Sequence, residues 1–121
     1  MRLQQHLQNP YHPGRVERPH GEGAALNPSC GDELRLTLRV DEGRICEARF
    51  QASGCAATLA AGSVVTGMLE GLHVQQVALC VTPEAIEEAL GGLPPQRRHA
   101  AVLASQAAVR AASAIPGQEF A

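Results

Sequence analysis

Two cysteines that stand beside glycines are the residues of this sequence best suited to chemistry. Cys30 begins the run Cys30-Gly31-Asp32, and Cys55 follows Gly54. Glycine lets the backbone bend and lets a bound ion or cluster come close, while the nearby carboxylate adds a second kind of donor. A cysteine that opens a helix also gains from the free N–H groups there, which favour its thiolate. Cys30, Asp32 and Cys55 are therefore candidate ligands of a metal site.

Two other interpretations of these cysteines stay open at the level of local pattern. They could be unrelated buried residues beside turn glycines, because an unpaired cysteine behaves as a small apolar side chain. A disulfide between Cys30 and Cys55 is geometrically possible. However, the N-terminal residues form no apolar signal segment, so a cytoplasmic location is expected, where disulfides are rare.

His99 is the natural fourth ligand, provided that the last helix packs over the same end of the sheet. It follows the rigid run Leu93-Pro94-Pro95, which restricts where its ring can point. By itself, a histidine in such a place is more often a surface or capping residue. Cys46 and Cys80 have no glycine neighbours, and we interpret Cys46 as a core residue and Cys80 as a core or boundary residue.

An antiparallel hairpin is the clearest structural signal in the chain. Residues 34–40 alternate strictly between apolar and polar side chains, and residues 44–51 alternate again after the turn residues 41–43. A three-residue turn pairs Val40 with Arg44 and places almost all apolar side chains of both strands on one face. A turn of two or four residues would divide them between the faces.

The expected register brings the two cysteine segments together. It sets Leu34 opposite Phe50, so that Cys30 and Cys55 leave the same end of the hairpin. Residues that are distant in sequence then lie near each other in space. The hypothesis of a shared metal site depends on this placement.

Helical periodicity covers much of the remaining chain, over residues 2–8, 56–69, 83–90 and 97–114. Thr82 is expected to cap the third of these helices. Residues 2–29 are expected to form an N-terminal helix and loop, with at most a short strand at 23–26, and residues 116–121 a frayed tail. The length predicts a single domain over residues 1–121.

Composition and charge exclude several classes of function. The formal net charge of −2 offers no basic stripe, so no nucleic-acid partner is expected. No stretch approaches the length of a membrane span, so no membrane partner is expected either. Because no nucleophile stands with a paired base, the chain is not expected to be an enzyme.

Five short segments follow one another in a fixed order, at residues 6–10 (HLQNP), 27–32 (NPSCGD), 50–55 (FQASGC), 93–95 (LPP) and 98–99 (RH). This ordered set resembles the NifU/IscU-type iron–sulfur cluster assembly scaffolds. The resemblance implies an α+β fold, with a small antiparallel sheet, helices packed on one face and a cluster site at one exposed end. It matches Cys30 and Cys55 to ligating cysteines, Asp32 to the acid that keeps the cluster labile, and His99 to the histidine beside the site.

The same resemblance implies a function, cofactors and partners. Such a scaffold assembles a labile [2Fe–2S] cluster, or holds its iron, with sulfur supplied by a cysteine desulfurase, and passes the cluster to apo acceptor proteins. Zn²⁺ is possible in the isolated protein. An Hsp70-type chaperone recognises Leu-Pro-Pro-Val-Lys in the family. Here the segment continues from Leu93, Pro94 and Pro95 as Gln96-Arg97, so chaperone binding is only a weak expectation.

The sequence departs from the family at Ala100, where relatives have a third cysteine that ligates the cluster and receives persulfide sulfur. Sulfur would then have to arrive at Cys30 or Cys55, and the harder donors would hold a cluster less firmly. Two further hypotheses stay open: a zinc-binding sulfur acceptor that activates a cysteine desulfurase, and a degenerate paralogue that acts as a regulatory binding module. Ala100 argues against the first, and the retained Asp32 and His99 argue against the second.

Overall fold

A three-stranded antiparallel sheet forms the base of the fold in the computed structural model, which describes residues 13–27 and 31–115. The strands are β1 (Gly21–Asn27), β2 (Asp32–Asp41) and β3 (Arg44–Ser53), and they lie side by side in that order. The helix predicted over residues 2–8, the tail at 116–121 and Cys30 lie outside the described residues.

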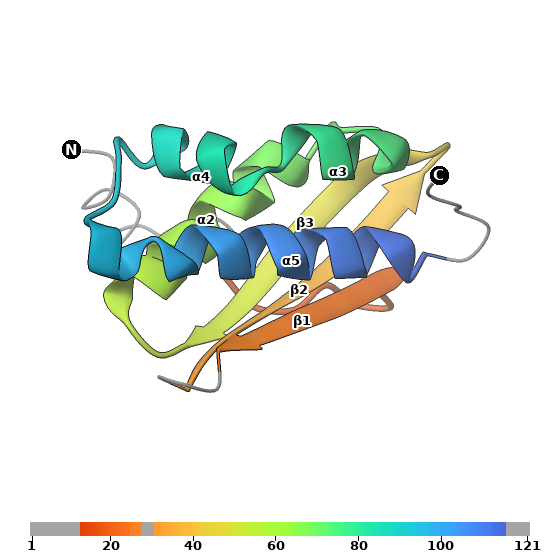
Figure 1. Ribbon diagram of the computed structural model, residues 1–121. Coiled ribbons are helices and arrows are strands. Elements are labelled where there is room, and N and C mark those ends of the chain that lie inside the picture. The colour runs from red at the N-terminus through yellow and green to blue at the C-terminus, as the bar shows by residue number, and fades with distance from the viewer. Residues whose placement is uncertain (1–12, 28–30, 116–121) are drawn as a thin grey trace.

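Two long helices cover one face of this sheet (Figure 1). α2 (Ala56–Leu69) packs on β3 and β2, and α5 (His99–Ser113) packs on β1 and β2. The shorter α3 (Val77–Cys80) and α4 (Pro83–Ala89) pack against α5. Single 3-10 turns, η1 (Val74–Gln76) and η2 (Pro95–Arg97), precede α3 and α5. The predicted α+β fold, with helices on one face of a small sheet, is confirmed.

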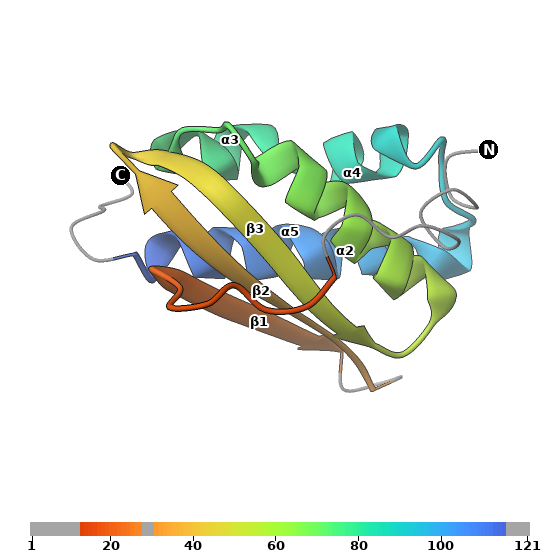
Figure 2. The same ribbon diagram turned by 180° about the vertical axis from the view of Figure 1, so that it is seen from behind.

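The other face of the sheet is crossed by residues 13–20, drawn in red in Figure 2. The backbone N–H of Gly14 bonds to the carbonyl of Phe50, and that of His20 bonds to the carbonyl of Leu38. Val16 in the middle of this segment is buried, and its N–H bonds to the Thr37 hydroxyl. Among the described residues, no helix is both long and apolar enough to cross a bilayer.

β2 and β3 form the predicted hairpin, but their observed pairing is shifted by two residues from the predicted register. Leu36 pairs with Phe50, where Leu34 was expected as the partner. The turn has two residues, Glu42 and Gly43, with φ angles of 52° and 81°. Positive φ at both central positions is typical of the type I′ turn, whose twist matches that of the flanking strands.

A β-bulge at Cys46 compensates for the shorter turn. Val40 pairs with Ile45 and Arg39 pairs with Glu47, so Cys46 is the extra residue in β3. Cys46 is therefore exposed, and its prediction as a core residue was wrong. Ile45, which the expected register placed on the outer face, is buried instead.

The prediction for Cys80 was also wrong, because this last residue of α3 is exposed. The short helix presents Val77 to the core, and Val81 just after it is buried as well. The apolar run that contains Cys80 therefore belongs to an amphipathic turn and not to a continuously buried segment.

The strand β1 is longer than the predicted segment 23–26, and it begins at Gly21, which has no side chain to contribute to an alternating pattern. Gly21 and Gly23 face α5 so closely that a Cβ on Gly23 would overlap the backbone N of Ala111. The facing side of α5 is built from buried alanines at positions 100, 101, 104, 107, 108, 111 and 112. Small residues on both surfaces let the backbones of the helix and the strand approach each other closely.

The remaining helices lie close to their predictions. α2 has the predicted bounds, and α4 starts at Pro83 with the Thr82 hydroxyl accepting from the N–H of Ala85. The last helix begins at His99, two residues later than predicted, because residues 95–97 form η2. His99 is therefore the first residue of α5.

Candidate metal site

The starts of β2, α2 and α5 meet at one end of the molecule (Figure 1). Asp32 is the first residue of β2, Cys55 is the N-cap of α2, and His99 is the first residue of α5. One ligand atom from each of these side chains lies within 4.8 Å of the other two. The structure thus brings together three of the four predicted site residues, while Cys30 lies outside the described part of the chain.

The Asp32 carboxylate is the centre of this group. It is almost fully buried, and its Oδ1 accepts a hydrogen bond of 3.0 Å from the backbone N–H of Cys55. Its Oδ2 lies 2.7 Å from His99 Nε2 and 3.4 Å from Cys55 Sγ. Because a buried carboxylate is costly without such partners, these contacts explain why an acid is tolerated here.

Gly54 allows the carboxylate to lie against the end of β3. Its φ angle of +123° is rarely adopted by residues with a side chain. A Cβ at this position would overlap Asp32 Oδ1. The glycine before Cys55 is therefore required by both its backbone conformation and the carboxylate beside it.

Thr58 is a member of this group that the sequence analysis missed. It is fully buried in the first turn of α2, where its hydroxyl donates to Asp32 Oδ2 over 3.2 Å. The hydroxyl oxygen of Thr58 also lies 3.4 Å from Cys55 Sγ. The spacing of three residues on a helix, which places Thr58 on the face of Cys55, is the signal that could have identified it.

The environment of Cys55 favours its thiolate. Burial and the contact with Asp32 raise the pKa of this thiol. Hydrogen bonds from Thr58 and from the Arg97 side chain together lower it by more, so the net pKa lies below the ordinary value. The thiolate is the form of cysteine that binds metal and attacks electrophiles. Arg97, in η2, was not among the predicted site residues.

His99 is shifted in the opposite sense. Its hydrogen bond to Asp32 raises the pKa of the imidazole, burial lowers it by less, and the contact with Cys55 raises it further. Without a metal, His99 therefore holds a proton more tightly than a free imidazole does. A metal ion that binds this nitrogen must displace that proton, which makes metal binding pH-dependent.

The spacing of the three donors suits a single small cation. Bonds of about 2.0–2.3 Å at tetrahedral angles put ligand atoms about 3.3–3.7 Å apart. The observed distances from Cys55 Sγ are 3.4 Å to Asp32 Oδ2 and 4.0 Å to His99 Nε2, close to that range. The distance of 2.7 Å between Asp32 and His99 is that of a hydrogen bond and would lengthen on metal binding. One thiolate, one imidazole and one carboxylate fit zinc or iron.

The site is open to the surface on the side of His99, whose side chain is 29% exposed. A hollow of about 270 Å³ begins there. Leu26 of β1 and Val102 of α5 line it and are 57% and 44% exposed, which is unusual for large apolar residues. A ligand or partner could therefore reach His99 from this side.

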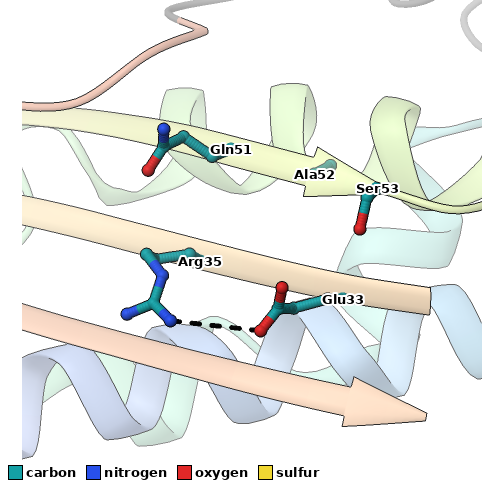
Figure 3. Close-up of a pocket in the computed structure, with 5 residues that line it drawn as sticks. All are labelled: Glu33, Arg35, Gln51, Ala52 and Ser53. Carbon is teal, nitrogen blue, oxygen red and sulfur yellow. Dashed lines mark ion pairs between the residues drawn. The ribbon is translucent and has the colours of Figure 1, made fainter. Parts of the chain in front are cut away.

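A second hollow, on the outer face of the sheet, has a different character (Figure 3). Glu33 and Arg35 of β2 and the residues 51–53 of β3 line it. Arg35 bonds to Glu22 over 3.0 Å and lies 3.9 Å from Glu33, so its charge is balanced within the protein. This hollow contains no thiol or imidazole, and we assign no metal site to it.

Comparison with known proteins identifies the family. All residues from 1 to 121 match the family described as "NifU-like N terminal domain". This chain belongs to that family. The membership agrees with the resemblance found in the ordered segments of the sequence.

Curated relatives of this NifU-like domain carry names that refer to cluster assembly. Two proteins of Archaeoglobus fulgidus, named "Iron-sulfur cluster assembly scaffold protein IscU 1" and "IscU 2", are each 42% identical over 106 residues, which is 88% of this chain and 69% of the relative. The "Nitrogen fixation protein NifU" of Cereibacter sphaeroides is 44% identical over 112 residues, 93% of this chain but 45% of the relative. The chain thus corresponds to one part of that longer protein.

Solved structures share the fold. A NifU-like protein (N-terminal) from Brucella abortus has a TM-score of 0.76 at 15% identity and covers 98% of this chain and 94% of its own. A putative scaffold protein for the SUF system from Fervidobacterium islandicum has a TM-score of 0.75 at 20% identity, covering 92% and 93%. At these identities the likeness concerns the fold alone.

Ala100 and the Leu93-Pro94-Pro95 segment, which the sequence analysis also singled out, can be located in the NifU-like domain. Ala100, where the resemblance implies a third cysteine in relatives, is fully buried in the first turn of α5. Its methyl group offers no donor to a metal. Leu93 before η2 is buried, while Pro94 and Pro95 at the start of η2 are exposed. The prediction of chaperone binding there stays a prediction.

Proposed function

We propose that this chain is an iron–sulfur cluster assembly scaffold that holds a labile [2Fe–2S] cluster, or its iron, and passes it to acceptor proteins. The observation that carries this proposal is the convergence of Asp32, Cys55 and His99 at one accessible end of the sheet. Membership of the NifU-like family, and relatives named as cluster assembly scaffolds, support it. Cys30 is proposed as the fourth ligand, since it lies two residues before Asp32.

The donor set is suited to transient holding. A thiolate is a soft ligand that matches iron in a cluster, whereas the carboxylate and imidazole are harder and bind it less firmly. In this protein the carboxylate already has hydrogen-bond partners from Cys55 and Thr58. When bound, the cluster would supply the iron and sulfide that are to be transferred. The protein would supply a site from which they can leave.

The partners follow from the same chemistry. A cysteine desulfurase is proposed as the source of sulfur and apo iron–sulfur proteins as the acceptors. The half-buried Cys55, whose pKa is lowered, is the described thiol placed to receive sulfur, because the methyl group of Ala100 cannot do so. The partners would approach from the exposed side of His99, beside the apolar rim formed by Leu26 and Val102.

Anaerobic reconstitution with ferrous iron and sulfide tests the proposal. The wild-type protein is expected to develop a visible cluster absorption with matching iron and sulfide contents. Cys30→Ala and Cys55→Ala should lose it. Cys46→Ala and Cys80→Ala are matched controls that remove exposed thiols outside the site, and both should retain it.

Two results would contradict the proposal. One is a cluster that survives in Cys55→Ala, and the other is a wild-type protein that takes up no iron under any reducing condition. Stoichiometric zinc without a cluster chromophore, lost in Cys55→Ala, would favour the zinc-binding sulfur acceptor instead. Absence of any metal would leave a regulatory module without a functional metal site.

A further inference from the structure

Thr58 has an unusual place for a hydroxyl group. Thr58 is fully buried, yet its hydroxyl donates to the Asp32 carboxylate at the end of the sheet and not to a backbone carbonyl of its own helix. It lies within hydrogen-bond distance of Asp32 Oδ2 at 3.2 Å and of Cys55 Sγ at 3.4 Å. A single proton is therefore placed between a carboxylate and a thiol that are both candidate ligands.

We propose that Thr58 is a positioning residue of the metal site, whose hydroxyl holds the Asp32 carboxylate beside the Cys55 sulfur for metal binding. This inference rests on the proposed function, because it assigns a role within the same site. Thr58 does not contact the metal in this role. It acts through Asp32 and Cys55, as a hydrogen-bond partner of metal ligands commonly does.

The other contacts of Asp32 show why such a residue is needed. His99 and the Cys55 thiol both contact Oδ2, but both are candidate ligands whose donor atoms a metal would engage. The backbone N–H of Cys55 holds Oδ1. Thr58 contacts Oδ2 without being a candidate ligand, so its bond can persist in the metal-bound site and keep the carboxylate in place.

The same helix provides a matched control. Thr66 is also fully buried in α2, and its hydroxyl donates to the backbone carbonyl of Ser63 over 2.8 Å. Thr66→Val and Thr58→Val therefore remove one buried hydroxyl each from the same helix and replace it with a methyl group. They differ in whether that hydroxyl faces the metal site.

Zinc affinity, measured by competition with a chromophoric chelator, is the first test. Thr58→Val is expected to raise the dissociation constant for zinc about 10–100-fold, the range found when a partner of a metal ligand is removed. Thr58→Ser keeps the hydroxyl and should bind zinc nearly as the wild type does. Thr66→Val should leave zinc affinity unchanged. Thr58→Ala is measured in parallel, since it removes the hydroxyl without placing a new methyl group against the carboxylate.

Cobalt substitution provides a readout that a merely structural role would not move. The visible d–d bands of bound Co²⁺ report the ligands and their geometry, so they should change in Thr58→Val, recover in Thr58→Ser and match the wild type in Thr66→Val. The inference is overturned if Thr58→Val and Thr58→Ala bind zinc as tightly as the wild type, or if Thr66→Val weakens binding equally. Failure of the wild type itself to bind zinc through Cys55 would overturn the proposed site and this inference together.

Discussion

At the scale of single residues, Gly54 determines how closely the Asp32 carboxylate can approach the backbone of Cys55. The carboxylate occupies the volume that a side chain at position 54 would need. From this position the carboxylate accepts a hydrogen bond from the backbone N–H of Cys55, which has no partner within α2. Asp32 is therefore both a candidate ligand and the hydrogen-bond acceptor for the backbone N–H of Cys55, the N-cap of α2.

Substitution of Gly54 by alanine should separate these two contributions from the cost of backbone strain. Gly54→Ala is expected to displace the carboxylate and to weaken zinc binding by about 10–100-fold. Gly91→Ala is the control, because Gly91 also has a positive φ of 81° but no atom within 4 Å of its Cβ position. Each variant should lose about 1–3 kcal/mol of unfolding free energy from the positive φ. Gly54→Ala should lose more than Gly91→Ala, because its Cβ overlaps the Asp32 carboxylate, and only Gly54→Ala should lose zinc affinity. Equal zinc affinity in the two variants would contradict the assignment of Asp32 to the site.

The ion pair between His99 and Asp32 should make the stability of the metal-free protein depend on pH. The pKa of His99 is raised in the folded state, chiefly by its hydrogen bond to Asp32. The folded protein therefore binds this proton more strongly than the unfolded chain. The stabilisation is complete below the ordinary histidine pKa of about 6.5 and is lost as pH rises through the raised value.

Urea unfolding in the presence of a chelator, for the wild type and His99→Gln, measures this dependence. The difference in unfolding free energy between the two proteins should be larger at about pH 5.5 than at about pH 8.5. His73→Gln controls for removing a histidine elsewhere, since His73 caps η1 and makes no contact with Asp32 in the described structure. A difference that grows with pH would have the wrong sign and would exclude the ion pair as its cause.

At the scale of elements, the hairpin shows which parts of the structure could be predicted. Alternation in residues 34–40 and 44–51 identified both strands, and the register error of two residues kept every side chain from Ala48 onward on its predicted face. The bulge at Cys46 could not be predicted, because parity alone cannot distinguish a three-residue turn from a two-residue turn with one bulged residue. The exposure of Cys46 follows from that ambiguity.

For the candidate site, too, the sequence predicts some neighbours and not others. Asp32 and Cys55 flank the paired ends of β2 and β3, so any register near the observed one brings them together. The position of His99 depends on how α5 docks on the sheet, which no local pattern specifies. His99 was therefore predicted as a ligand only on that condition, and the resemblance to a family supported it. Thr58 was missed because a threonine in an alanine-rich helix carries no signal until its neighbour Cys55 is known to be a ligand.

The packing of β1 against α5 should be sensitive to a single methyl group. At Gly23 a Cβ would overlap Ala111 N and would lie 2.7 Å from the carbonyl oxygen of Ala107. Since the obstacles are backbone atoms, strand and helix must separate to admit it. Gly23→Ala is expected to lower the unfolding free energy by about 1–3 kcal/mol, as overpacking does in other cores.

Ala24→Ser provides the comparison, because Ala24 is the next residue of β1 and alternates to the other face of the sheet. Chemical denaturation of both variants checks the prediction. Ala24→Ser should unfold close to the wild type, and a Gly23→Ala protein of wild-type stability would show that the helix can shift without cost.

At the scale of the whole molecule, the site joins the sheet to the two long helices that cover it. Asp32 belongs to the sheet, Cys55 begins the helix over β3, and His99 begins the helix over β1. The layer between sheet and helices consists largely of alanine, leucine and valine, with Phe50 as its one buried aromatic side chain among the described residues. Such a core offers modest apolar area, so a metal that ties the sheet to both helices has much to add.

Zinc binding should therefore stabilise the entire domain and not only the loop around the site. A ligand that binds only the folded state raises the unfolding free energy by about 2.7 kcal/mol when its free concentration is about a hundred times its dissociation constant. We expect this increase in chemical denaturation of the wild type, its loss in Cys55→Ala, and its reversal by a chelator. Cys80→Ala, which removes an exposed thiol, should retain it. Amide hydrogen exchange should slow along α5 and β2 as well as at α2, because these elements meet at the donors. Protection confined to the segment around Cys55 would show that the metal is held by one element, and that the three donors do not act as a single site.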